Sequence, residues 1–275
     1  MVIIGGRPGQ IHKPMRAYIQ HIGKTGLDMA GSLRHILSFS VAIISRMFDG
    51  TLNNSAVRMV LLNQIYFTSV QILPLFVGVS IIFGSILIGI VFQILKSVGL
   101  TDYVGHILMG FVVTELSPFI TVLLIALRSG SAINAEIAVM KVNKELGTLD
   151  AFRIDIIDYL FLPRITNGII SVVLLSGLFS IVVLMSGLLY SKFILGMSVD
   201  AYMNVLLNSV EFPDIIILLL KCATFGFFII LIPMLSGLGA SFELTSIPVA
   251  VLNGMMRVFS AIVIIEVLSL IVKYI

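Results

Sequence analysis

The chain has 275 residues, of which 59% are hydrophobic and only 11% carry a charge. Its mean hydropathy of +1.14 excludes an ordinary soluble domain, in which about half of the residues are apolar and about a quarter charged. The net charge is only +3, and the single cysteine, Cys222, excludes a disulfide framework within the chain. These features predict an all-α integral membrane protein.

The first 58 residues contain no run that is apolar enough to span a membrane. Residues 1–16 are rich in glycine and basic residues, and no compact apolar core and cleavage site follow them, which predicts a cytoplasmic arm without a signal peptide. Between 17 and 48, apolar residues recur at spacings of three and four. This pattern predicts an amphipathic helix lying in the membrane interface, with an ordinary half-buried helix as the alternative.

Residues 59–275 form the predicted transmembrane domain. Because a span needs about 20 mostly apolar residues, the chain holds five predicted spans, at 68–95, 106–128, 165–191, 215–238 and 247–272. A short helix and loop are expected between 193 and 213, and a turn between 237 and 245.

Small residues four apart occur twice in the first span, as Ser80 with Gly84 and as Ser85 with Gly89. This spacing lets helix backbones approach closely in lipid. It indicates a packed face, which is either a dimer contact or a contact within the chain.

Lysine and arginine concentrate in the arm and in the segment 129–164, whereas the opposite loops hold only Lys96 and Lys192. The positive-inside rule therefore predicts that the N-terminus and residues 129–164 are cytoplasmic. Five spans then place the C-terminus on the outer side.

Two charges fall inside predicted spans, Glu115 and Lys221. Each costs about 2.5–3.5 kcal/mol near the bilayer centre, so both are expected to point into the bundle or a wet cavity. They form either a buried ion pair or a polar lining for a substrate, and the two roles are compatible. Pro118 favours a kink beside Glu115. Glu266 is either a third member of this group or a residue at the outer surface.

The segment between the second and third spans is predicted to contain a helix at about 131–146. Ile133, Ile137 and Met140 share one face, with Glu136 beside it. An amphipathic cytoplasmic helix of this kind suits the groove of a partner protein. The alternative is a connecting helix that lies on the membrane.

Two short motifs do not support catalysis by this chain. Gly23-Lys24-Thr25 resembles the end of a phosphate-binding loop, but Tyr18 stands where that loop requires glycine. Ser129 would need a neighbouring base to act as a nucleophile, and no histidine follows His106. The four histidines have no metal-ligand spacing, and nothing indicates nucleic-acid binding. The chain is therefore predicted not to be an enzyme.

The stretch from Glu115 to Arg164 resembles the MlaE-type permease family, the membrane subunits of ABC transporters that move phospholipids between membranes. The matching residues align without a gap and are Glu115-Leu116-Ser117-Pro118, 126–132, 135–140, Glu145-Leu146, Asp155 and Pro163-Arg164. Further matches outside this stretch are Gln64-Ile65-Tyr66, Asp214, Lys221 and Phe225-Gly226.

The resemblance implies a homodimeric permease in the inner membrane that moves phospholipids between the inner and outer membranes. Its partners would be a cytoplasmic ABC ATPase dimer carrying ATP and magnesium, a periplasmic MCE-domain lipid-binding protein and, as an open addition, a small cytoplasmic accessory subunit. This chain itself would hold no cofactor. The lipid would lie in a cavity at the dimer interface.

The resemblance also implies two groups of site residues. The expected substrate-binding residues are Leu87, Leu95, Glu115, Leu116 and Lys221. The expected ATPase-coupling residues are Arg128, Ala135, Glu136, Met140 and Glu145. The alternative function is an ion-coupled secondary transporter of a lipophilic substrate, with Glu115, Lys221 and Glu266 as a relay.

Overall fold

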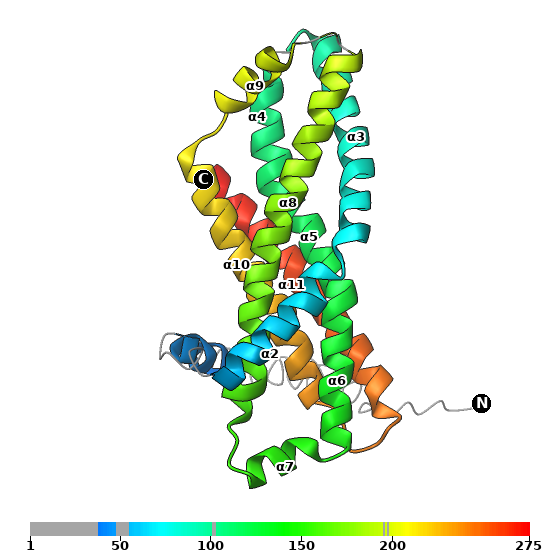
Figure 1. Ribbon diagram of the computed structural model, residues 1–275, viewed down its shortest axis with the longest axis vertical. Helices are drawn as coiled ribbons and strands as arrows, with labels where there is room; N and C mark the ends of the chain where they lie inside the picture. Colours follow the sequence, from blue (N-terminus) through cyan, green and yellow to red (C-terminus); the bar gives the residue numbers. More distant parts are fainter. Residues whose placement is uncertain (1–37, 48–54, 101–102, 195, 197) are drawn as a thin grey trace, which may run out of the picture.

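The computed structural model describes residues 38–47, 55–100, 103–194, 196 and 198–275, which form an elongated helical bundle without a β-strand (Figure 1). The predicted arm 1–16, the first part of the 17–48 helix and Gly23-Lys24-Thr25 lie outside the described residues. Five helical runs are long and apolar enough to cross a membrane: Val57–Val98, Val104–Val142, Ile157–Phe193, Phe212–Leu238 and Ser246–Lys273. The predicted all-α fold with five spans is confirmed.

The first span changes direction near Pro74. It consists of α2 (Ser55–Ile65), the π-helical turn η2 (Tyr66–Val70) and α3 (Leu73–Val98). Proline has no N–H and cannot continue the helical hydrogen-bond ladder, so a bend forms where it occurs. As a result α2 runs obliquely across the bundle while α3 stands upright (Figure 1).

The second span is one helical run with two π-helical stretches. Its parts are α4 (Val104–Ile107), η4 (Leu108–Leu116), α5 (Ser117–Ile125), η5 (Ala126–Gly130) and α6 (Ser131–Val142). The N–H of Ser117 donates to the carbonyl of Val112, five residues back. Pro118 follows directly, so the missing α-helical bond is accommodated by a wider turn.

The sequence predicts a single helix at about 131–146, but the structure has two helices there, so the predicted bounds are wrong. Residues up to Val142 continue the second span as α6, and a separate helix, α7 (Glu145–Ala151), follows. Lys144 between them has a positive φ of 61°, which breaks the helix. α7 lies at one end of the bundle (Figure 1) and has no buried residue.

The third span begins with the π-helical turn η6 (Ile157–Phe161) and continues as α8 (Leu162–Ile194). The short helix expected between 193 and 213 is α9 (Val199–Leu207), at the end opposite α7 (Figure 1). Tyr202 holds α9 against α8. Its ring is buried, and its hydroxyl donates to the Leu184 carbonyl at 3.1 Å. Burial raises the pKa of Tyr202 to about 12.

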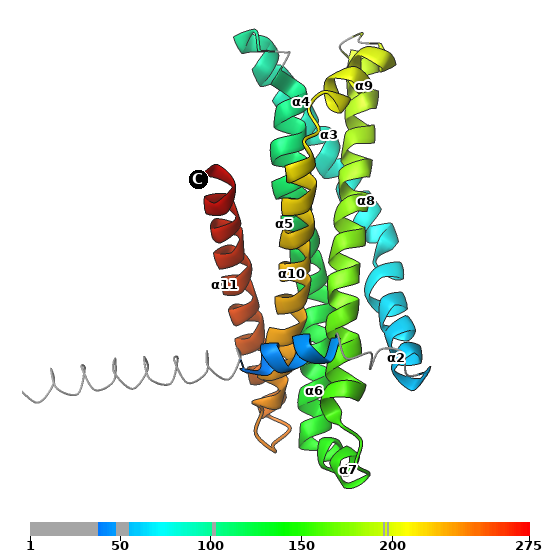
Figure 2. The same ribbon diagram turned by 90° about the vertical axis from the view of Figure 1, so that its left-hand side faces the viewer.

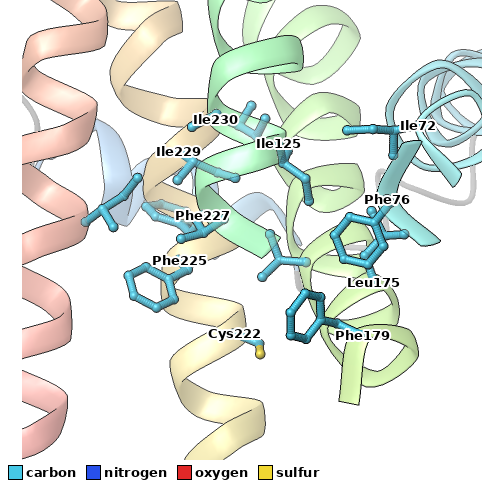
Figure 3. Packing of buried hydrophobic residues seen from close by; sticks show 14 of the residues in the cluster. Ile72, Phe76, Ile125, Leu175, Phe179, Cys222, Phe225, Phe227, Ile229 and Ile230 are labelled. Atoms are coloured by element: carbon cyan, nitrogen blue, oxygen red, sulfur yellow. The ribbon is translucent and has the colours of Figure 1, made fainter. Parts of the chain in front are cut away.

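The fourth and fifth spans are α10 (Phe212–Leu238) and α11 (Ser246–Tyr274). α10 lies beside α8, where a Cβ on Gly226 would come within 2.5 Å of the Ile169 Cα. Only a glycine permits this approach. Close to this contact, aromatic and aliphatic side chains of α3, α5, α8 and α10 form the apolar core (Figure 3).

The small residues of the first span serve a contact within the chain. A Cβ on Gly84 would lie 3.0 Å from the Cα of Val183 in α8, and a Cβ on Gly89 would lie 3.3 Å from the Tyr190 ring. Of the two alternatives that the sequence left open, the structure shows the intrachain packing of α3 on α8.

A short apolar helix, Ser38–Met47, lies across the bundle rather than along it (Figure 2). Ile43 is fully buried, and the Phe39 ring packs edge-on against Phe161 at 5.2 Å. Arg46 forms ion pairs with Asp155 at 2.6 Å and Asp158 at 2.7 Å. The guanidinium of Arg46 lowers the pKa of the Asp155 carboxyl below its ordinary value.

Candidate functional site

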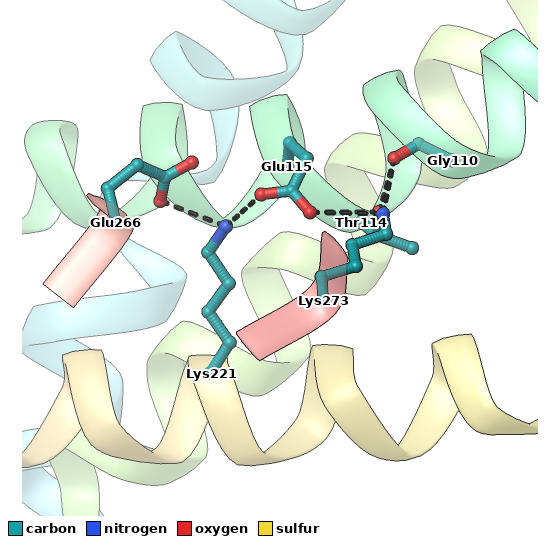
Figure 4. Close-up of polar contacts among 6 residues, drawn as sticks. All are labelled: Gly110, Thr114, Glu115, Lys221, Glu266 and Lys273. Atoms are coloured by element: carbon teal, nitrogen blue, oxygen red, sulfur yellow. Dashed lines mark hydrogen bonds and ion pairs between the residues drawn. The ribbon is translucent and has the colours of Figure 1, made fainter. Parts of the chain in front are cut away.

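Four charged side chains meet inside the bundle (Figure 4): Glu115 from η4, Lys221 from α10, and Glu266 and Lys273 from α11. Glu115 and Lys221 are 3% and 4% exposed. The Lys221 ammonium donates a hydrogen bond to Glu115 and lies 2.9 Å from Glu266 Oε2. Lys273 Nζ lies 3.1 Å from Glu115 Oε1. The four residues thus connect the second, fourth and fifth spans.

The charges of this cluster balance, with two carboxylates and two ammonium groups. Lys273 also donates to the Gly110 carbonyl at 2.7 Å and to the Thr114 hydroxyl oxygen at 2.5 Å. Buried charges are tolerated only when they are paired and hydrogen-bonded. A matched cluster of this kind joins the three spans that contribute to it.

The predicted pairing of Glu115 with Lys221 is present, and Glu266 joins them rather than lying at the outer surface. Sequence reasoning missed Lys273. It lies seven residues after Glu266, and two helical turns place both residues on the same face of α11. That spacing was the available signal.

An apolar groove of about 580 Å³ runs between α10 and α11 beside this cluster. Among the described residues, Lys221 is the one charged residue in its wall. The other lining residues are Ile217, Leu220, Thr224, Phe228, Ile232, Ala261, Ile264, Ile265, Leu268, Ser269 and Val272. The Nζ of Lys221 is directed to Glu115 and Glu266, so the groove itself presents an apolar wall of the kind that suits an apolar chain.

Three of the five expected substrate-binding residues lie apart from this groove. Leu95 is buried in the core, Leu116 packs against that core, and Leu87 is half-buried on α3. Lys221 lines the groove, and Glu115 is in direct contact with Lys221. Their role in substrate binding stays a prediction.

The apolar face of α6 packs against its own chain, contrary to the expectation that it would enter a partner's groove. Ile133 and Ile137 are buried. Asn134 donates to the Ala250 carbonyl of α11 at 3.2 Å, and a Cβ on Gly254 would lie 2.0 Å from the Asn134 amide nitrogen. Neighbouring helices of the same chain pack on this face. The sequence pattern of α6 alone does not reveal them.

The expected coupling residues divide between two places. Arg128 donates to Gln71 of the first span at 3.0 Å, and Glu136 pairs with Arg164 of α8 at 2.6 Å. Ala135 and Met140 are half-buried on α6, and Glu145 accepts a hydrogen bond from Asn143 at 3.0 Å. Of the five, only Glu145 belongs to α7. The coupling role of all five stays a prediction.

Sequence reasoning also missed the apolar surface next to α7. Phe152, directly after this helix, is 73% exposed. Leu146, Leu149 and Phe152 are spaced by three, which places them near one another on a helical turn. This spacing was a signal for a contact surface on α7.

Five spans with a charged interior and an adjoining apolar groove define a multi-pass membrane protein. The family model described as Permease MlaE matches residues 61–272. The chain belongs to this family, and the recognition made from residues 115–164 is confirmed.

Similar proteins agree with this assignment. A "Probable ABC transporter permease protein" of Synechocystis is 32% identical over 58% of this chain and 63% of that protein. A protein with the same description from Rickettsia felis is 27% identical over 78% of this chain and 82% of its own length. The "Intermembrane phospholipid transport system permease protein MlaE" of Haemophilus influenzae is 31% identical over 57% of this chain and 62% of that protein.

The chain is therefore a multi-pass inner-membrane permease of the ABC transporter class. Membrane subunits of this class are generally non-catalytic and work with ATPase subunits. The ion-coupled alternative finds the residues of its relay in contact, but membership in an ABC permease family favours an energy source outside the chain.

Proposed function

We propose that this chain is the permease subunit of an ABC transporter that moves phospholipids between the inner and outer membranes. The observation that carries this proposal is the apolar groove between α10 and α11, with Lys221 in its wall. An acyl chain fits such a slot, and the charged cluster lies where the polar part of the lipid would pass. The name of the Haemophilus influenzae relative supports the substrate class.

The proposed orientation places the α7 end in the cytoplasm and the C-terminus on the periplasmic side. Lys141, Lys144 and Arg153 lie in or beside α6 and α7, and cytoplasmic loops carry the excess of Lys and Arg. The crosswise helix Ser38–Met47 (Figure 2) would then lie in the cytoplasmic interface of the membrane.

The partners follow from the same arrangement. A second copy would cover the open side of the groove, since Val263, Ile264 and Leu268 of α11 are exposed apolar side chains. The lipid would then lie at the interface between the two copies. A periplasmic MCE-domain protein at the α9 end would exchange lipid with this cavity.

A cytoplasmic ATPase dimer, which holds ATP and magnesium, would bind α7 and Phe152, with room for a small accessory subunit. A push on α7 would pass through the turn at Lys144 to α6, and because α6 continues the second span without a break, it would reach Glu115. The Glu136–Arg164 ion pair joins α6 to α8, so the third span would move with it. This motion would open the charged cluster and release the lipid.

Filling the groove tests the substrate site. Leu268→Trp adds a bulky ring to a half-exposed wall position. It should lower ATP-dependent phospholipid transfer in proteoliposomes roughly tenfold, which corresponds to about 1.4 kcal/mol of lost affinity. Leu189→Trp, at a similarly exposed site on α8, is the control and should leave transfer unchanged. Equal transfer by both variants would remove the groove from the transport path.

Replacing Phe152 tests the ATPase contact. Phe152→Ser removes an exposed aromatic side chain, the type of residue that anchors protein interfaces. The ATPase should then no longer copurify with the permease. Phe193→Ser is the control, because Phe193 is 77% exposed near the end of α8 that adjoins α9. Loss of the ATPase with Phe193→Ser, and its retention with Phe152→Ser, would reverse the proposed orientation.

A further inference from the structure

A second cavity, of about 450 Å³, lies between the first and second spans. Its walls come from α2 and η2 on one side and from η5 and α6 on the other. Six of its lining residues are polar: Gln64, Thr68, Gln71, Arg128, Ser129 and Glu136. This composition is opposite to that of the groove between α10 and α11, although both cavities are bordered by membrane-spanning helices.

One arginine, Arg128, lines this cavity, whereas Arg164 lies behind the lining and is joined to it through Glu136. Arg128 lines the cavity and donates to the neutral Gln71. Arg164 is only 2% exposed and gives one nitrogen to Glu136, while its Nε and Nη1 are buried without a hydrogen-bond partner. Glu136 is the one carboxylate in the lining. Among the described residues, Arg164 neutralises Glu136, and Arg128 is left with the neutral Gln71 as its partner.

The floor of the cavity is held in place by buried hydrogen bonds. Asn167 of α8 is fully buried and donates to the Thr68 hydroxyl at 2.9 Å. The Ser171 hydroxyl donates to the side-chain amide oxygen Oδ1 of Asn167 and also contacts the Ser69 hydroxyl at 2.6 Å. These contacts fix η2 against α8, so Thr68 is held in place in the cavity wall.

The surroundings of the cavity suit a lipid better than a soluble anion. Phe67 in its wall is 57% exposed, and Leu127 next to Arg128 is 55% exposed. Such side chains face acyl chains in a membrane-spanning protein. α2 also lies at the same height of the bundle as the crosswise helix Ser38–Met47 (Figure 2), where an amphipathic helix meets lipid head groups.

We infer that this cavity binds the phosphate head group of a phospholipid, with the acyl chains lying over Phe67 and Leu127. A phosphate diester carries a single negative charge, which would match that of Arg128, the lining residue whose partner is the neutral Gln71. Arginine forms paired hydrogen bonds with phosphate oxygens. The site is separate from the groove beside Lys221, so a lipid occupies it whether or not the groove carries the transported molecule.

The test uses the full chain in maltoside micelles and phosphate-free buffer, so that no other phosphate competes. The probe is phosphatidylglycerol with a photoreactive diazirine on an acyl chain. Crosslinks should map to peptides that contain Phe67 or Leu127. Arg128→Gln should lower them roughly tenfold, since hydrogen bonds to charged groups contribute about 1.5–3 kcal/mol. Arg128→Lys should retain part of the labelling.

Matched controls separate recognition of the phosphate from general affinity for lipid. Arg257→Gln removes an exposed arginine of α11 that lines a different cavity, and it should leave labelling unchanged. Diacylglycerol with the same diazirine lacks the phosphate and should label at least roughly tenfold less. Ala132→Trp narrows the cavity without a change of charge and should also lower labelling. This second variant tests the same site if Arg128→Gln does not fold.

Three results would overturn the assignment. Equal labelling by diacylglycerol and phosphatidylglycerol would show that the phosphate is not recognised. Unchanged labelling of both Arg128→Gln and Ala132→Trp would place the lipid elsewhere. Loss of labelling in millimolar inorganic phosphate would assign the cavity to a soluble anion. None of these results depends on the groove, which Leu268→Trp tests on its own.

Discussion

The cluster around Lys221 and the cavity around Arg128 both bring charges into a membrane-spanning bundle, but they satisfy those charges differently. In the cluster, two lysines meet two carboxylates, and Glu115 and Lys221 are almost fully buried. In the cavity, Arg128 has a neutral amide as its partner, and behind the lining the buried Arg164 pairs with Glu136.

The cluster and the cavity thus use charged residues in a membrane-spanning bundle for two different purposes. A matched set needs nothing from outside and joins the helices that contribute to it. A set with one charge in excess, open to the surface, is completed by a ligand of the opposite sign. The cluster therefore joins the second, fourth and fifth spans, and the cavity is the place for the lipid site proposed above.

The largest predicted effect comes from breaking the matched cluster. Lys221→Met leaves Glu115 and Glu266 facing each other in the interior without the central ammonium group. Removal of one partner from a buried ion pair costs about 3–5 kcal/mol. The free energy of unfolding, measured in mixed micelles, should fall by that amount.

The matched control is Lys273→Met, because Lys273 lies at the edge of the same cluster and Glu115 keeps Lys221 as its partner. The loss should be smaller, in the range of about 1–3 kcal/mol for an unsatisfied buried group. A double variant, Glu115→Gln with Lys221→Met, should recover part of the stability lost in Lys221→Met. If Lys221→Met and Lys273→Met lowered the free energy of unfolding equally, Lys221 would not be more important to the cluster than Lys273.

The smallest predicted effect concerns a third type of charge, the ion pairs of Arg46 on the outside of the bundle. Arg46 lowers the pKa of Asp155 below its ordinary value of 3.8. The pair therefore stabilises the fold above about pH 4, and the contribution disappears as the pH falls through the lowered pKa. Both side chains are about a third or more exposed, so Asp155→Asn should cost less than about 1 kcal/mol at pH 7.

The measurement is the unfolding midpoint of Asp155→Asn and of the unchanged protein between pH 7 and pH 3. The difference between the two proteins should shrink toward zero at the acid end of this range. A difference that grows as the pH falls would mean that Arg46 does not control this carboxyl.

Much of the candidate site followed from particular residues. Glu115 and Lys221 were expected to face inward because a charge in lipid is costly, and they are in contact. Lys273 was missed because a lysine near a helix end usually reaches the membrane surface, and only the packing of α11 turns it onto Glu115. The pairing of Arg128 with the neutral Gln71 at the cavity depends on which helices meet.

The sequence by itself determined the class of the protein, the five spans and the inward direction of the interior charges. These properties depend on runs of apolar residues and on the cost of burying charge, which act locally. Only the tertiary structure decided that α6 continues the second span and packs against α11 through Asn134 and Gly254. The physical reason is that the face a helix buries is set by the shape of its neighbours, and those neighbours lie more than a hundred residues away along the chain.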